Sequence, residues 1–386
     1  ENCVKLLRIE LPRTVSRLEK GAFKRCRALR EVNLGGNLEQ VEEQVFFQCR
    51  CLEKITFPDT LTSIGGLAFY RCRSLREVKL SAKVAQVGSL AFAESGVERV
   101  RMAADGRSWG SDIFSGCDRL RELVLEEGVS HIPDRLAKGC AVLEQVILPG
   151  SLASAGVHVW ERTPFLESWI QEGRKGEIFW DGGNLQGEVR LPENVRILAG
   201  GAFYGNRDIA VIHLPESVKW VGPRAFDDCG RLRRVFWHSP VDRLEEAVFA
   251  DCSELESVED AQGRPVAWRS IGGRAFFHCR SLKKICLRQT ESIGAETFCG
   301  CTGLQWSRDC AMPSGVLRKI GERAFEATVL VEESGKRGFE ETALVEENGK
   351  RGFEETALVE ENGKGGFEEA AFAGKNGKCI AERNDL

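Results

Sequence analysis

Patterns that would indicate an enzyme or a membrane protein are missing from this 386-residue sequence. Histidine occurs five times, and none of the five lies at helical spacing from another. There is no His-Glu-x-x-His, Walker A or Gly-x-Gly-x-x-Gly motif, and no run of about 18 apolar residues that could form a transmembrane helix. No Asn-x-Ser/Thr sequon occurs, so N-glycosylation is not expected. We therefore predict no catalytic residue, no cofactor and no membrane span.

An excess of positive charge is also missing. The sequence has 54 basic and 58 acidic residues, interspersed, for a net charge of −4. Binding to nucleic acid requires a basic face that neutralises phosphates. The charge balance therefore argues against nucleic acid as a partner, and the 42% hydrophobic content is that of an ordinary folded protein.

What the sequence does contain is a repeat. Its cleanest copies read Ile-Gly-x-x-Ala-Phe-x-x-Cys-x-x-Leu-x-x-Val-x-Leu, most often at a spacing of 23 residues. Such a period predicts a solenoid, in which each unit buries its apolar face against its neighbours. The Phe position falls at Phe23, Phe46, Phe69, Phe92, Phe114, Ala137, Trp160, Phe203, Phe226, Phe249, Phe276, Phe298 and Phe325.

Each repeat predicts a short sequence of elements. A segment such as Leu75-x-x-Val78-x-Leu80 has the alternation of a strand with one buried face. A proline often follows, and a second short extended piece such as 61–65 leads to the glycine. The Ala-Phe pair is expected in one turn of α- or 3₁₀-helix, with the Phe in the core. The expected fold is a repeat solenoid, either α/β or mainly β, with one parallel main strand per repeat and short helical or 3₁₀ turns.

Cysteine occupies the slot three residues after the Phe position in nine repeats. Ser95, Thr163, Asn206 and Thr328 replace it elsewhere, so the slot favours a small side chain that can form a hydrogen bond at a tight bend. Stacked coils bring such cysteines to about 5 Å, within disulfide range. We predict free thiols, because parallel Cβ vectors make the disulfide torsion unfavourable. The nine are Cys26, Cys49, Cys72, Cys117, Cys140, Cys229, Cys252, Cys279 and Cys301.

A zinc site is a weaker interpretation of the remaining cysteines. Four sulfurs, those of Cys286, Cys299, Cys301 and Cys310, are close enough in the sequence to be considered. Cys301 belongs to the repeat slot, however, and Cys286 lies within a predicted strand. We therefore predict no metal ligands.

The repeat residues resemble the BspA-like class of leucine-rich repeats. The segment Leu214-Pro215-x-x-Val218-x-x-Val221-Gly222-x-x-Ala225-Phe226-x-x-Cys229 is similar to one unit of that family. The resemblance covers residues 3 to about 328. It implies a curved leucine-rich-repeat arc used in surface display, adhesion and protein binding, and it supplies no catalytic residues.

The resemblance extends to a break in the repeat. Thr163-Pro164-Phe165-Leu166 is similar to an interruption found in bacterial members, and we expect strands at 177–180 and 188–191 to form a hairpin there. After Phe325 the spacing falls to 14 residues, in a segment that could form either helices or strands. The predicted organisation is repeats at 1–163, an insert at 164–192, repeats at 193–328 and a low-complexity tail at 329–386. Because Cys3 begins in the middle of a repeat, the sequence is expected to be a piece of a longer protein.

The outward positions of the predicted strands suggest a binding surface. They are polar in the first repeats and become apolar between Val124 and Phe236. An apolar stripe beside charged positions is typical of protein-binding surfaces, although the insert could instead cover it. The candidate contact residues are Val124, Ile147, Ile170, Val211, His213 and Phe236, with Lys79, Arg99 and Arg101 steering an acidic partner.

The hypothesis that follows is a non-catalytic module that binds another protein, acts as a monomer and is displayed at a cell surface. The surface location follows from the family resemblance alone. An intracellular scaffold for protein–protein interaction is the alternative. An enzyme subunit would need a catalytic domain elsewhere.

Overall fold

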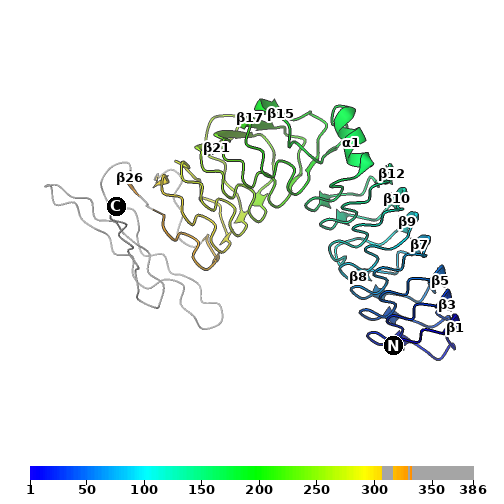
Figure 1. The fold of residues 1–386 in the computed structure, drawn as a ribbon. Helices are drawn as coiled ribbons and strands as arrows, with labels where there is room; N and C mark the ends of the chain where they lie inside the picture. Colours follow the sequence, from blue (N-terminus) through cyan, green and yellow to red (C-terminus); the bar gives the residue numbers. More distant parts are fainter. Residues whose placement is uncertain (307–315, 329–330, 333–386) are drawn as a thin grey trace, which may run out of the picture. The chain divides into compact units, whose positions relative to one another are not determined.

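The computed structural model describes residues 1–306, 316–328 and 331–332. The chain divides into two compact units, Glu1–Trp180 and Asp181–Leu386 (Figure 1). In each unit, short strands from successive repeats pair in parallel. The repeat solenoid predicted from the 23-residue spacing is therefore confirmed. The predicted tail, 329–386, lies outside the described residues except at 331–332.

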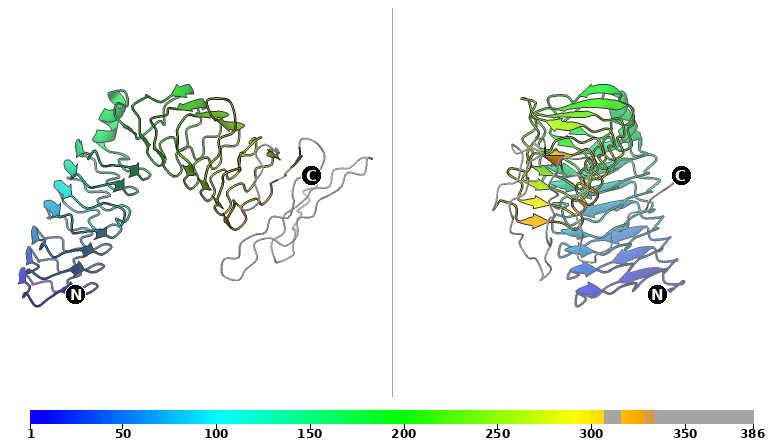
Figure 2. Two further views of the ribbon diagram at one scale, coloured as in Figure 1. Left: turned by 180° about the vertical axis from the view of Figure 1, so that it is seen from behind. Right: turned by 90° about the vertical axis from the view of Figure 1, so that its left-hand side faces the viewer.

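One row of strands carries the Leu-x-x-Val-x-Leu segments. Figure 2 shows these strands as successive arrows along the stack. In the first unit the row consists of β1 (Arg8–Glu10), β3 (Glu31–Asn33), β5 (Lys54–Thr56), β7 (Glu77–Leu80), β9 (Arg99–Met102), β10 (Glu122–Leu125) and β12 (Gln145–Ile147). In the second unit it consists of β15 (Gly187–Arg190), β17 (Ile209–Leu214), β19 (Arg234–Trp237) and β21 (Ser257–Glu259). Each strand pairs with the equivalent strand of the next repeat, in a register that places equivalent residues opposite each other, such as Val78 and Val100.

The short extended piece expected after each main strand forms a second parallel row. The first unit contains β2 (Arg17–Leu18), β4 (Gln40–Val41), β6 (Ser63–Ile64), β8 (Gln86–Val87), β11 (His131–Ile132) and β13 (Ser154–Ala155). The second contains β16 (Ile197–Leu198), β18 (Trp220–Val221), β20 (Arg243–Leu244), β22 (Ser270–Ile271), β23 (Ser292–Ile293) and β25 (Lys319–Ile320). The remaining strands are β14 (Ile178–Phe179) and the parallel pair β24 (Gln305–Trp306) and β26 (Val331–Glu332).

The segment that carries Ala-Phe forms consecutive turns, not the helical turn that we expected. In all thirteen repeats, the residues two before and two after the Phe position have positive φ, which a right-handed helix does not contain. Alternate amides then reach the next coil, and those of Phe46 and Gln48 donate to the carbonyl oxygens of Ala68 and Tyr70 at 2.8 Å each. The turns therefore add a third set of hydrogen bonds between coils.

The phenylalanines stack in the core, as predicted. Phe23, Phe46, Phe69, Phe92 and Phe114 form one stack in the first unit, with adjacent ring centroids 4.9–5.5 Å apart. A second stack runs from Phe203 through Phe226, Phe249, Phe276 and Phe298 to Phe325, at 5.1–5.5 Å. Phe69 and Phe226 are fully buried. Each ring thus fills the space between two neighbouring rings rather than an isolated cavity.

The cysteine slot forms hydrogen bonds at the bend, again as predicted. Each thiol from the second repeat of a stack onward donates to the carbonyl oxygen of the Phe one coil earlier. Cys49 donates to Phe23 at 3.1 Å and Cys229 to Phe203 at 3.0 Å. In the last repeat, the hydroxyl of Thr328 replaces the thiol and donates to the carbonyl of Phe298 at 2.6 Å.

The insert begins with an eight-residue helix, α1 (Pro164–Gln171). Thr163 caps it, because its hydroxyl accepts a hydrogen bond from the amide of Leu166 at 3.2 Å, and Pro164 occupies the first turn. Trp169 is buried, and its indole N–H donates to the carbonyl of Lys175 at 2.8 Å. No helix among the described residues is long and apolar enough to span a membrane.

We predicted that the strand at 188–191 closes a hairpin within the insert, and this prediction is wrong. β15 pairs in parallel with β17, with Val189 opposite Ile212, so it belongs to the main row of the second unit. The physical reason is visible in the sequence, where Val189-x-Leu191-Pro192 repeats the ending of a main strand. Val189 and Leu191 are accordingly buried.

Candidate functional site

The outward side chains of the first unit form two rows across the sheet β7–β9–β10–β12. Strand register aligns Glu77, Arg99, Glu122 and Gln145 in one row, and Lys79, Arg101, Val124 and Ile147 in the other. Neighbouring parallel strands lie about 4.8 Å apart. The structure therefore brings together five of the predicted contact residues, namely Lys79, Arg99, Arg101, Val124 and Ile147.

The row from Lys79 to Ile147 combines positive charge with apolar surface. Ile147 is 55% exposed, one of four large exposed hydrophobic side chains among the described residues, whereas Val124 beside it is 6% exposed. Since Ile147 remains open to solvent, the part of the insert that belongs to this unit does not cover it. We call Lys79, Arg101, Val124 and Ile147 the mixed row.

The adjacent row carries charges that alternate in sign. Glu77, Arg99 and Glu122 follow one another, and Arg99 Nε lies 3.6 Å from a carboxylate oxygen of Glu122. Arg101 lies 3.9 Å from the carboxylates of both Glu122 and Glu126. Lys79 and Arg101 are neighbours in the mixed row, and the carboxylates of Glu77, Glu122 and Glu126 beside that row balance the charges of Lys79, Arg99 and Arg101.

The second unit carries the other three predicted strand residues, on β17 and β19. Register places Val211 opposite Arg234 and His213 opposite Phe236. The rings of His213 and Phe236 stack, with centroids 4.4 Å apart and planes 13° apart. The guanidinium of Arg234 lies 5.8 Å from the centroid of Phe236. Apolar and aromatic surface here also lies beside positive charge.

His213 is held by a hydrogen bond to Glu188 on the neighbouring strand β15. Its Nε2 lies 3.0 Å from Oε1 of Glu188, and an Nη of Arg190 lies 2.6 Å from the same carboxylate oxygen. Burial lowers the pKa of His213 and the nearby Arg190 lowers it further, while the Glu188 carboxylate opposes both. The imidazole is therefore neutral at pH 7 and stacks on Phe236 as an uncharged ring.

Ile170 does not belong to either surface. We expected it on an outward strand position, but it lies in α1, where Thr163 and Pro164 begin a helix. The strand of the repeat is replaced here by a helix that Thr163 and Pro164 start. Ile170 is therefore removed from the candidate contact residues.

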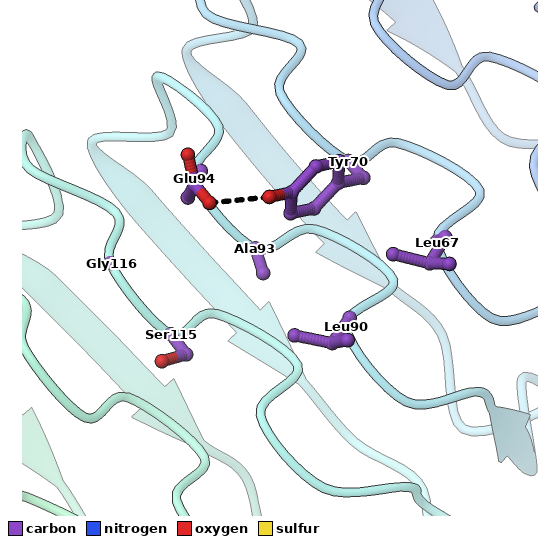
Figure 3. Close-up of a pocket in the computed structure, with 7 residues that line it drawn as sticks. All are labelled: Leu67, Tyr70, Leu90, Ala93, Glu94, Ser115 and Gly116. Carbon is purple, nitrogen blue, oxygen red and sulfur yellow. Dashed lines mark hydrogen bonds between the residues drawn. The ribbon is translucent and has the colours of Figure 1, made fainter.

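The sequence did not predict a hollow on the first unit, at the edge formed by the consecutive Ala-Phe turns, which is called here the turn edge. The hollow is lined by Leu67, Tyr70, Leu90, Ala93, Glu94, Ser115 and Gly116, has a volume of about 430 Å³, and is named here the Tyr70 hollow. In Figure 3 the side chains of Leu67 and Leu90 point in the same direction, and the Tyr70 hydroxyl faces Glu94. That hydroxyl donates a hydrogen bond to the Glu94 carboxylate.

The hollow arises because an aromatic row on the turn edge stops. Phe47 and Tyr70, each the residue after a core Phe, stack with centroids 5.3 Å apart. The next two repeats have Ala93 and Ser115 at this position, and neither fills the space that a ring would occupy. The change from Phe47 and Tyr70 to Ala93 and Ser115 is the sequence signal that could have revealed it.

Glu94 is fixed at the rim of the hollow. Nε of Arg71 donates to its Oε2 at 2.7 Å, and an Nη donates to its Oε1 at 3.2 Å. These bonds, Arg71 first, hold the pKa of Glu94 below its ordinary value. Burial is the main cause that raises the pKa of Tyr70, and the carboxylate adds to it. The rim thus presents an ionised carboxylate beside a neutral phenol.

The repeat sequence and the parallel coils match a known family. The profile described as BspA type Leucine rich repeat region (6 copies) matches residues 1–121, 39–167, 176–305 and 264–334. The chain belongs to this family. The family assignment made from the repeat residues is therefore confirmed, whereas no curated protein matches the chain.

Several solved structures of bacterial leucine-rich-repeat proteins are similar to this BspA-type chain. One from Bacteroides ovatus is 25% identical, with 84% of this chain and 77% of that chain covered and a TM-score of 0.40. A leucine rich cell surface protein from Faecalibacterium prausnitzii is 20% identical, covering 80% and 91%, with a TM-score of 0.36. One from Eubacterium ventriosum is 16% identical, covering 78% and 83%, with a TM-score of 0.33.

Two features of the BspA-type repeats superficially suggest catalysis. His131 Nδ1 lies 2.8 Å from the hydroxyl of Ser154 on the next coil. Ser270 and Ser292 make the same contact between coils at 2.7 Å, so it is a side-chain ladder of the second strand row. Residues 106–110 have the Gly-x-Ser-x-Gly spacing, but Ser108 lies in an exposed turn with no helix after it, unlike a nucleophile elbow.

The remaining cysteines do not form a ligand cluster in the part of the chain that the structure describes. No group of three or more His, Cys, Asp or Glu side chains there is placed to hold a metal ion. Cys301 donates to the carbonyl of Phe276 at 3.0 Å, as the other slot cysteines from the second repeat of a stack onward do, and the nine slot cysteines are called here the cysteine ladder. Cys310 lies outside the described residues.

Proposed function

We propose that this chain is a non-catalytic module that binds another protein through the outward face of its main strands. The observation that carries the proposal is the mixed row. Strand pairing aligns Lys79, Arg101, Val124 and Ile147 in this row, and the side chain of Ile147 is 55% exposed. Apolar residues at the centre of a contact supply most binding energy, and charges at the rim mainly set association rate and specificity. Lys79, Arg99 and Arg101 would attract an acidic partner.

The stacked pair His213 and Phe236 supports a contact of the same kind in the second unit. Both rings are partly exposed on the outward face, next to Val211. Aromatic side chains provide large contact area and are enriched in protein interfaces. The two surfaces, one on each unit, can be tested separately.

The proposal is tested with a displayed random-peptide library selected on the wild-type protein. Selected peptides are expected to lose binding to Ile147→Asp or to Phe236→Asp, because each change puts a charge at the centre of one contact. Leu7→Asp and Tyr204→Asp are the matched controls, since both residues are exposed hydrophobics outside the two surfaces. Peptides that bind the Ile147 and Phe236 variants as well as the controls would place the contact elsewhere.

We further propose display at a cell surface, with an intracellular scaffold as the alternative. Thirteen free cysteines among the described residues favour the alternative, because thiols persist in reducing compartments. An antibody raised against the chain separates the two. Staining of intact source cells supports surface display, and staining only after permeabilisation supports the scaffold.

A further inference from the structure

We propose that the Tyr70 hollow binds an aromatic side chain that carries a hydrogen-bond donor, a tyrosine or tryptophan of a partner protein. The inference rests on the proposed protein-binding function and names a second contact for it. It concerns the turn edge of the first unit, whereas the mixed row lies on the outward face of the main strands.

The first argument is the shape left by the interrupted aromatic row. Coils repeat at the spacing of stacked rings, as the 5.2 Å between Phe46 and Phe69 shows. A ring stacked beyond Tyr70 would occupy the position that the side chain of residue 93 would fill if it were aromatic. Ala93 carries no ring at this position and is itself covered by its neighbours, at 1% exposed, and Ser115 and Gly116 on the next coil line the same hollow. The volume of about 430 Å³ is within the usual range of ligand sites.

The second argument is the apolar wall. Leu67 and Leu90 have φ of 57° and 58°, a left-handed conformation that is uncommon for a residue of this kind. Other repeats have Gly, Asp, Arg or another polar residue at this position, with alanine once, at Ala247. Two leucines on neighbouring coils therefore accept a conformational cost where they line the same hollow. Their side chains provide apolar contacts for the edge and face of a ring.

The third argument is the fixed acceptor. The carboxylate of Glu94 is held by Arg71 and Tyr70, and each carboxylate oxygen can accept more than one hydrogen bond. A phenol O–H or an indole N–H on the bound ring could donate to it. A hydrocarbon ring could not, so the rim favours tyrosine and tryptophan over phenylalanine.

The chain offers a specific spectroscopic probe, because its two tyrosines are Tyr70 and Tyr204. Ring-¹³C-labelled tyrosine in the whole chain gives two sets of resonances, which Tyr204→Phe assigns. The protein is titrated with p-cresol, 3-methylindole, toluene and methyl β-glucoside. We expect saturable shifts of the Tyr70 resonances with p-cresol and 3-methylindole and weaker effects with toluene. Tyr204, in the second unit, serves as the internal control and should show no saturable shift.

Variants test whether the shifts come from the hollow. Ala93→Phe places a ring where Phe47 and Tyr70 have theirs and should remove the saturable shift. Ala250→Phe changes the same repeat position in the second unit and should retain it. Circular dichroism checks that both fold. Leu67→Gly is a second variant whose positive φ suits glycine, and it should weaken binding through the lost apolar wall.

Three outcomes would overturn the inference. These are the absence of a saturable Tyr70 shift, a shift unchanged in both Ala93→Phe and Leu67→Gly, and a stronger response to the glucoside than to the aromatic probes. None of them bears on the Ile147 and Phe236 variants. Conversely, the aromatic probes could bind at the hollow while every selected peptide still binds the Ile147 and Phe236 variants. That result would support the site at the hollow and contradict the proposed contact on the strands.

Discussion

The thiol of Cys72 donates a hydrogen bond to the carbonyl oxygen of Phe46 in the preceding coil, at 3.2 Å. Both residues are fully buried. The same contact links Cys140 to Phe114 at 3.2 Å and Cys279 to Phe249 at 3.0 Å. The cysteine slot therefore joins coils through a sulfur donor, and a thiol in this role must stay protonated.

This contact predicts that the ladder cysteines are free but unreactive in the native protein. Burial raises the pKa of Cys49 and of Cys301 to about 12, and the thiolate is the reactive form. A maleimide reagent should label exposed Cys3 in the native protein and leave the nine ladder thiols unlabelled. After denaturation without reductant, all nine should react. Ladder cysteines that stay unlabelled at that stage would show disulfides instead.

The phenylalanine stack predicts a large stability loss from a single truncation. Phe69→Ala should lower the free energy of unfolding by about 3–5 kcal/mol, because it leaves a cavity between two neighbouring rings. Phe47→Ala is the matched control, since Phe47 lies at the turn edge and is only partly buried. Denaturant unfolding of both variants measures the difference. Equal losses would contradict the assignment of Phe69 to the core.

The sequence predicted the parts of the fold that depend on the repeat itself. The spacing predicted stacked coils, and the Phe and Cys positions predicted the core ring and the donor at the bend. The turn conformation was missed because positive φ occurs at residues as different as Arg25, Leu90 and Glu94, so no residue type marks it. Only the hydrogen bonds between coils explain it.

The candidate site was predicted less completely, for two physical reasons. The repeat pattern predicts a strand at Ile170, whereas the capping residues Thr163 and Pro164 start a helix there, and the local capping signal prevails over the period. The Tyr70 hollow depends on which side chains are neighbours on adjacent coils, and Ala93 becomes informative only once Tyr70 is placed beside it.

The positive φ of the turns predicts that glycine can stabilise one repeat. Ala247 has a φ of 53°, and an L-residue in this region costs roughly 1–2 kcal/mol. Ala247→Gly should therefore raise the free energy of unfolding, by up to about 1 kcal/mol once the greater freedom of glycine in the unfolded chain is included. Ala250→Gly, three residues later and also buried, is the control and should lower stability. A loss from both changes would contradict the left-handed turn.

The burial of His131 predicts a pH dependence of stability. Burial lowers the pKa of His131 below its ordinary value of 6.5, and it outweighs the carboxylates of Asp134 and Asp105, which raise it. Between the folded pKa and 6.5 the unfolded chain binds more protons than the native one, so stability falls as pH decreases through this window. Well above 6.5 both states are neutral at this site and its contribution is constant.

His131→Gln should reduce this slope, because glutamine can still form a hydrogen bond with Ser154 but does not titrate. Some slope should remain, since the pKa of His213 is lowered in the same direction. Urea unfolding of the wild type and of His131→Gln at pH values from about 5 to 8 measures the effect around the ordinary histidine pKa. Parallel curves for the two proteins would mean that His131 gains or loses protons equally in both states. The hydrogen bond between His131 and Ser154 would then be a surface interaction that does not change the pKa of His131.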